Sequence, residues 1–108
     1  MRKEVLELKN IGRMPTETLE DTEDILSLIE KYDAVISNIE SPISFEEAKV
    51  IISIFPEGFF YDLHWDLVRL IESLLTQDEQ GYLEVISLCP SKEWKEVLNT
   101  RYLNWKKG

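Results

Sequence analysis

Few side chains of this sequence are of the types that most often do chemistry. His64 is the only histidine and Cys89 the only cysteine, which excludes a two-histidine dyad and a multi-histidine metal site. A Cys89–His64 pair would still need a third group and an activating loop, and neither is evident in the sequence. We interpret His64 as a packed or hydrogen-bonded residue at the edge of an apolar face. Cys89, directly before Pro90, is expected to be a small buried residue at a helix end.

Carboxylates are abundant, but they do not define a catalytic site. Asp62 and Asp66 are four residues apart and would share one face of a helix, whereas His64 would lie off that face, so a metal would need ligands from elsewhere. The four glycines are isolated and there is one cysteine, which excludes a glycine-rich phosphate loop and a CxxC pair. We therefore expect no catalytic residue, no metal site and no cofactor.

Charge is distributed very unevenly along the chain, whose net charge is −9. Residues 1–13 carry a net charge of +2, residues 14–84 carry −14 from 17 acidic and three basic side chains, and residues 85–108 carry +3. Such an acidic middle repels nucleic acid and anionic membranes and steers a basic protein toward itself. Acidity that serves solubility alone is the alternative interpretation. The basic C-terminal stretch with Tyr102 and Trp105 could form a small basic-aromatic patch, but we expect neither a nucleic-acid nor a membrane partner.

Cysteine usage and hydropathy indicate a cytoplasmic protein. One cysteine permits no internal disulfide, which suits a reducing compartment. The first residues, MRKEVLELKN, lack the apolar run of a signal peptide, and no segment approaches the ~20 apolar residues of a membrane span. We expect one domain over residues 1–108, with a core that needs neither metal nor disulfide.

The elements that position these side chains are predicted to be helices. Prolines and glycines separate segments whose apolar residues recur three and four apart. The predicted helices cover about residues 2–9, 18–39, 45–55, 59–75 and 79–88 and a stretch that begins after Ser91. The expected fold is all-α, with five or six antiparallel helices in a HEAT-like stack or a compact helical bundle.

Local signals refine these predicted helices. Ser44 and Glu47 predict a capping box, although the β-branched run KVIISIF leaves an edge strand as the alternative for this segment. Asp78 and Ser91 are predicted N-caps of the last two helices. Gly81, in the first turn after Asp78, is expected to weaken its helix by ~1 kcal/mol relative to alanine.

The segment from Phe59 to Leu75 is the predicted centre of the fold. At helical spacing its apolar stripe comprises Phe60, Leu63, Leu67, Leu70, Ile71 and Leu74, widened by Tyr61, Trp65 and Val68. The opposite face carries Asp62, Asp66, Arg69 and Ser73. Because so wide an apolar arc must be covered from more than one side, this helix is expected to lie at the centre.

Two short patterns carry a resemblance to a known family. The string WDLVRLIES runs from Trp65 to Ser73, and a WxxxLxxRxLN pattern runs from Trp94 to Asn104. Together they resemble immunity protein family 30, whose members are small helical bacterial proteins encoded beside polymorphic or contact-dependent toxins. The resemblance covers roughly residues 20–105. The family commonly has a histidine where Arg69 stands here, so no role tied to that histidine is transferred to this chain.

The resemblance implies an all-helical protein that neutralises a toxin domain by binding it, without catalysis. The implied partner is the C-terminal domain of a cognate toxin. Many such domains are basic nucleases, whose substrate-binding surface an acidic protein can cover. Complementary charge favours fast and selective association.

The candidate partner-binding residues are exposed acids and neighbouring aromatics. The first choices are Glu57, Asp62 and Asp66, the second choices are Asp33 and Glu40, and the aromatic anchors are Phe59 and Tyr61. Interfaces favour an apolar centre within a polar rim, although core is the competing assignment for Phe59.

Four further residues of the two patterns are assigned to the core, and one ion pair is expected. The core residues are Trp65, Ile71, Trp94 and Leu98. We expect Arg101 to reach Glu72 from the last helix.

Three hypotheses of function follow from these observations. The first is a stoichiometric toxin inhibitor, the second an acidic helical adaptor or regulatory module without a toxin partner, and the third a metal-dependent hydrolase. A neighbouring gene that ends in a toxin domain would separate the first from the second, and metal analysis of the purified protein would test the third.

Overall fold

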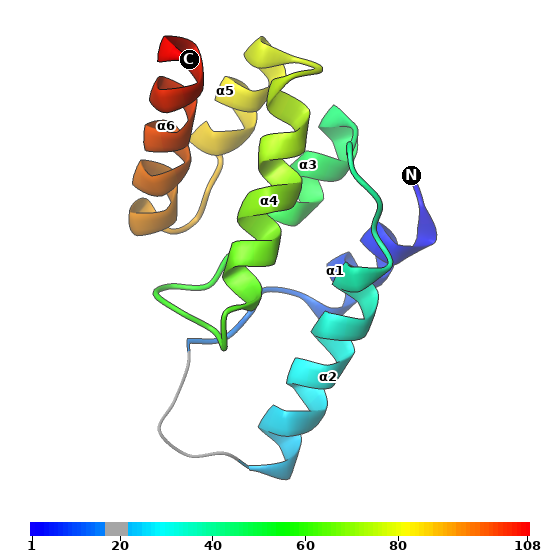
Figure 1. Cartoon of the computed structure of the whole chain (residues 1–108). Coiled ribbons are helices and arrows are strands. Elements are labelled where there is room, and N and C mark those ends of the chain that lie inside the picture. The colour runs from blue at the N-terminus through cyan, green and yellow to red at the C-terminus, as the bar shows by residue number, and fades with distance from the viewer. Residues whose placement is uncertain (17–21) are drawn as a thin grey trace.

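The computed structural model describes residues 1–16 and 22–108, and these residues form six α-helices (Figure 1). The helices are α1 (Lys3–Ile11), α2 (Glu23–Ser37), α3 (Phe45–Ser53), α4 (Leu63–Leu75), α5 (Glu79–Ser87) and α6 (Lys92–Lys107). The described part of the chain contains no β-strand. The predicted all-α fold is therefore confirmed, and the edge-strand alternative for KVIISIF is wrong.

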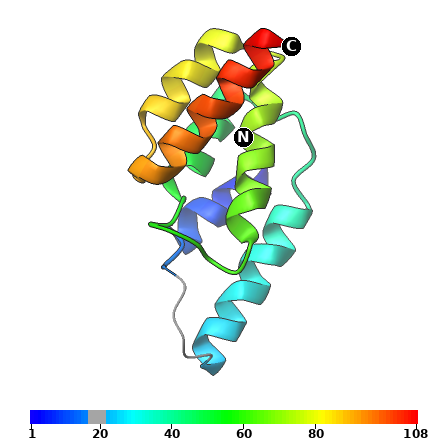
Figure 2. The same cartoon turned by 60° about the vertical axis from the view of Figure 1, so that its left-hand side comes forward.

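Helix α4 is the centre of a compact helical bundle. It packs against α2, α3, α5 and α6, whereas α1 packs against α2 and α3. Its inward residues join one continuous hydrophobic cluster with residues of all the other helices. In Figure 1, α5 and α6 flank one side of α4, and Figure 2 shows α5 and α6 side by side. The molecule measures 43 × 28 × 21 Å, and the first turns of α2 project from the end opposite α5 and α6.

The predicted N-caps are all present. Ser44 Oγ accepts a hydrogen bond from the Glu47 backbone N–H, and the Glu47 carboxylate accepts one from the Ser44 N–H, which completes the capping box. Asp78 Oδ1 accepts from the Gly81 N–H at the start of α5, and Ser91 Oγ accepts from the Trp94 N–H at the start of α6. Each cap satisfies a backbone donor that the first helical turn leaves open.

Within the described residues, helix α2 begins at Glu23. Thr22 is its N-cap and accepts a hydrogen bond from the Ile25 N–H. The predicted start at about Thr18 lies outside the described residues.

The prediction that the central helix begins at Phe59 is wrong, because α4 begins at Leu63. Tyr61 and Asp62 have φ angles of 46° and 65°, which place their backbones in the left-handed region and interrupt a right-handed helix. Asp62 is thus the N-cap of α4 and does not share a helical face with Asp66. Phe60 nevertheless reaches the core from this loop and is fully buried.

The core assignments from the sequence are largely confirmed, with Trp65 as the exception. Ile71, Trp94 and Leu98 are buried, but Trp65 keeps 43% of its surface exposed, so its assignment to the core is wrong. Trp94 and Arg101 of α6 both contact the Trp65 ring, Trp94 edge to face and Arg101 at 5.9 Å from the ring centroid, but they leave much of the ring open to solvent. Phe59 is 51% exposed, so its core alternative is wrong as well.

Candidate functional site

The loop between α3 and α4 is held in place from two sides. Arg13 Nη2 pairs with Glu57 Oε1 at 3.0 Å, and Thr16 Oγ1 donates to the Glu57 carbonyl at 2.8 Å, both from the segment after α1. From α6, Trp94 Nε1 donates to the Gly58 carbonyl at 2.7 Å. Gly58 has a φ angle of 74°, which glycine adopts without steric cost. Polar contacts from distant segments therefore fix the loop.

His64, in the first turn of α4, is a structural residue that contacts this loop. It is 1% exposed, and its Nδ1 accepts a hydrogen bond of 3.0 Å from the Phe60 N–H. This contact assigns the ring proton of the neutral imidazole to Nε2. The ring lies against Trp94, with centroids 4.8 Å apart. The interpretation of His64 as a packed, hydrogen-bonded residue is confirmed.

Four rings meet at the start of α4 and form what we call the aromatic cluster: Phe59, His64, Trp65 and Trp94. Trp94 lies 6.0 Å from Phe59 and 5.2 Å from Trp65 between ring centroids, both edge to face. His64 contacts the same two rings at 5.1 and 5.5 Å. His64 and Trp94 are buried, whereas Phe59 and Trp65 are about half exposed. Two large apolar rings are thus presented to solvent on a rigid, buried base.

Three carboxylates lie within three residues of Phe59 or Trp65 in the sequence, and we call Glu57, Asp62 and Asp66 the rim carboxylates. Glu57 and Asp62 are exposed and Asp66 is half-buried. Asp66 pairs with Arg69 at 3.7 Å, which is a long contact, and the Arg69 side chain is 68% exposed. Among the described residues, no basic side chain forms an ion pair with Asp62. Glu57 is already paired with Arg13 at 3.0 Å, so Asp62 and the weakly paired Asp66 are the rim carboxylates most open to a cationic partner.

The remaining candidate residues differ in how closely they adjoin the cluster. Tyr61 is half-buried and packs edge to face on Phe60, at 5.2 Å. Asp33 is exposed on α2, directly after Tyr32, whose ring contacts Phe60 at 5.9 Å.

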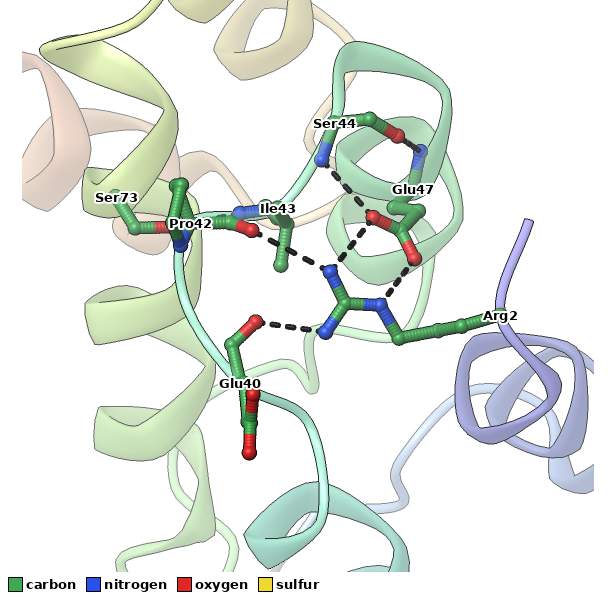
Figure 3. A network of polar contacts seen from close by, with 7 residues as sticks. All are labelled: Arg2, Glu40, Pro42, Ile43, Ser44, Glu47 and Ser73. Carbon is green, nitrogen blue, oxygen red and sulfur yellow. Dashed lines mark hydrogen bonds and ion pairs between the residues drawn. The ribbon is translucent and has the colours of Figure 1, made fainter.

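Glu40 lies at a different place on the molecule, within a network centred on Arg2 (Figure 3). Arg2 Nη1 donates to the Glu40 carbonyl at 2.7 Å, and Arg2 Nε pairs with Glu47 at 2.6 Å. In the same loop the Ile43 N–H donates to Ser73 Oγ on α4. Ser73 is eight residues beyond Trp65, or about 12 Å along the helix axis. The structure therefore does not bring Glu40 together with the aromatic cluster.

A second acidic feature beside Trp65 was not predicted from the sequence. A shallow groove of about 380 Å³ between α4 and α6 is lined by Trp65, Glu93, Glu96, Val97, Thr100, Arg101 and Asn104. Glu93 and Glu96 are one helical turn apart, a spacing visible in the sequence, but their position beside Trp65 depends on how α6 packs on α4. Only that packing joins them to the candidate site.

The expected ion pair between Arg101 and Glu72 is confirmed. Arg101 Nη1 lies 3.1 Å from Glu72 Oε1, and Arg101 Cζ lies 5.9 Å from the centroid of the Trp65 ring. Arg101 of α6 therefore contacts two residues of α4, because it pairs with the Glu72 carboxylate and lies over the Trp65 ring.

The geometry offers little support for nucleophilic or metal chemistry. Cys89 is buried, and burial raises the pKa of its thiol, which keeps the thiol protonated at neutral pH. Within residues 1–16 and 22–108, no three potential ligands converge on a point where they could hold a metal ion. Of the helices described, none combines the length and the apolar character that crossing a membrane requires.

Comparisons with protein-family models, with curated proteins and with solved structures returned no match to this chain.

Proposed function

We propose that this protein is an immunity protein that neutralises a cognate toxin by binding the toxin's C-terminal domain. The observation that carries the proposal is the aromatic cluster, in which Phe59 and Trp65 are exposed on buried Trp94 beside the rim carboxylates. The protein would act by stoichiometric binding and without catalysis, in the cytoplasm of the cell that it protects.

Rigid aromatic side chains are effective anchors of protein interfaces. Phe59 and Trp65 bring large apolar areas whose conformational freedom is already restricted by contact with Trp94 and His64. Little further entropy is lost when a partner covers them, so more of the contact energy is available for binding. The hydrogen bond from Trp94 to Gly58 keeps both anchors fixed relative to each other.

The charge around these anchors favours a basic partner. Glu57, Asp62 and Asp66 each lie within three residues of Phe59 or Trp65 in the sequence, in a stretch whose net charge is −14 over residues 14–84. Long-range attraction speeds the encounter with a basic surface, and complementary charge at the rim selects against acidic partners. A basic nuclease domain has such a surface, which agrees with the partner that the family resemblance implies.

An acidic helical adaptor without a toxin partner is the alternative. The same aromatic cluster and rim would suit any basic protein surface, so the surface alone does not separate the two functions. The neighbouring gene does, because an immunity protein is encoded beside its toxin.

The test is protection of bacteria that express the toxin domain encoded by the adjacent gene. The wild-type chain should restore growth, and the F59A/W65A variant should lose most of that protection. The control L88A/W105A removes exposed apolar surface elsewhere, since Leu88 is 54% and Trp105 41% exposed, and it should still protect. Loss of protection with the control alone, or full protection by F59A/W65A, would refute the proposal.

A further inference from the structure

The groove between α4 and α6 combines an aromatic face with carboxylates. Trp65 forms one wall, and Glu93 and Glu96 of α6 lie on the other. Both glutamates are exposed, and among the residues that the structure describes no basic side chain forms an ion pair with either. With Glu72 nearby and Arg101 as the basic residue of the lining, the groove is negative.

Within the protein, the Trp65 ring already contacts a guanidinium group. The Arg101 guanidinium lies 5.9 Å from the centre of the ring while it pairs with Glu72 at 3.1 Å. A planar guanidinium can stack on an indole and bond to a carboxylate at the same time, whereas an ammonium group is a more strongly hydrated point charge. Arg101 and Glu72 thus show one such arrangement inside the protein.

We infer that the α4–α6 groove is the seat for an arginine side chain of the partner protein, which stacks against Trp65 and pairs with Glu93 and Glu96. This inference rests on the proposed function, because it assigns the chemistry of one contact within that interface. Charge complementarity selects the occupant: the groove offers an aromatic face and two carboxylates without basic partners, which together match a guanidinium. Arg101 is a positioning residue here, since it lies over the Trp65 ring while its pair with Glu72 holds it in place.

The arginine seat can be tested without the partner. The probe is a capped glycine tripeptide with arginine at its centre, titrated into the full ¹⁵N-labelled chain while the indole N–H signal of Trp65 is followed. Its signal is identified by its loss in W65F. The arginine peptide should shift this signal saturably, and the matched lysine and citrulline peptides should bind at least about threefold more weakly.

Two charge-matched variants separate local recognition from general attraction. E93Q/E96Q should weaken binding of the arginine peptide at least about threefold. E7Q/E30Q, which removes two exposed carboxylates from α1 and α2, should change the affinity for this peptide by less than about twofold. An unmoved Trp65 signal, equal binding of lysine, or equal effects of the two variants would overturn the inference.

The outcomes also distinguish the seat from the proposed function. A toxin domain that fails to bind while the arginine peptide shifts Trp65 refutes the immunity function and leaves the seat supported. If E93Q/E96Q binds the toxin domain as the wild type does and the arginine peptide leaves the Trp65 signal unmoved, the arginine seat is refuted and the immunity function is not.

Discussion

The indole Nε1 of Trp94 donates a hydrogen bond of 2.7 Å to the carbonyl oxygen of Gly58, which joins α6 to the loop before α4. Through this contact a residue near the end of the chain fixes the backbone that carries Phe59. The same indole ring supports Trp65 edge to face. One buried tryptophan thus organises both exposed rings of the aromatic cluster.

This relationship predicts unequal roles for two tryptophans in stability. Trp94→Phe should lower the free energy of unfolding by about 2 to 4 kcal/mol, because it loses a hydrogen bond and leaves a cavity. Trp65→Phe should cost less than about 1 kcal/mol, because the ring is half exposed. Urea denaturation of both variants measures the difference. Equal losses would contradict the assignment of Trp94 as the support and Trp65 as the surface residue.

Gly81 offers a test of how tertiary context reverses a helix propensity. Propensity alone predicts that Gly81→Ala stabilises α5. In the structure, however, a Cβ at this position would overlap the Asp78 carboxylate and lie 3.0 Å from Phe45 Cδ1. The substitution should therefore displace the N-cap and destabilise the protein by about 0.5 to 2 kcal/mol in urea denaturation.

The N-cap explanation for Gly81 can be isolated with Asp78→Ala as a background. Because the cap is already absent in that background, adding Gly81→Ala should lower the free energy of unfolding much less than it does in the wild type. A Gly81→Ala single variant more stable than the wild type would show that the cap tolerates the methyl group.

Glu47 is expected to make the free energy of unfolding depend on pH. Burial raises the pKa of this carboxyl, but the hydrogen bond from the Ser44 backbone and the contacts with Arg2 outweigh it, so the pKa lies below its ordinary value of 4.5. A lowered folded-state pKa gives stability that is present above the ordinary value and lost as the pH falls through the lowered one. Glu47→Gln should therefore cost about 1 to 3 kcal/mol at pH 7 and much less near pH 3.

Urea denaturation at several pH values measures this effect of Glu47. The control is Glu46→Gln on the same helix. The Glu46 side chain is 66% exposed, so loss of its charge should change the free energy of unfolding little at any pH. A deficit of Glu47→Gln that stays constant between pH 7 and pH 3 would rule out the ionised network around Arg2 as its cause.

The sequence contains most of the information for the helices. Apolar spacing located all six, and Ser44, Asp78 and Ser91 marked three starts correctly, because caps and periodicity depend on nearby residues. The start of α4 was misplaced because the left-handed backbone at Tyr61 and Asp62 leaves no trace in the apolar pattern. The loop that contains these two residues is held at Glu57 and Gly58 by contacts from Arg13, Thr16 and Trp94, which are distant in the sequence.

The candidate site was less predictable than the fold. Trp65 has the spacing of a core residue, yet its ring is half exposed where α6 packs on α4. The same packing brings Glu93 and Glu96 to Trp65, and the contacts of Arg2 keep Glu40 at another part of the molecule. Local sequence determines which residues are acidic or aromatic, but distant contacts determine which of them share a surface.

The rim carboxylates should control the rate of association with the toxin domain. Asp62→Asn with Asp66→Asn should slow association and weaken its dependence on salt, because long-range attraction is screened by ions. Asparagine tolerates the left-handed backbone at position 62, so stability should change little. Stopped-flow mixing at low and physiological salt measures the rates, with E7Q/E30Q as the charge-matched control. Equal slowing by the control would remove this face from the interface.

The central claim is that the aromatic cluster binds the toxin domain encoded beside this protein, and the equilibrium dissociation constant tests it most directly. Titration calorimetry should detect a one-to-one complex with the wild-type chain. F59A/W65A should raise Kd at least about 30-fold, as expected for the loss of a central anchor, while L88A/W105A leaves it nearly unchanged. A Kd for F59A/W65A equal to that of the wild type, or the absence of any complex, would contradict the claim.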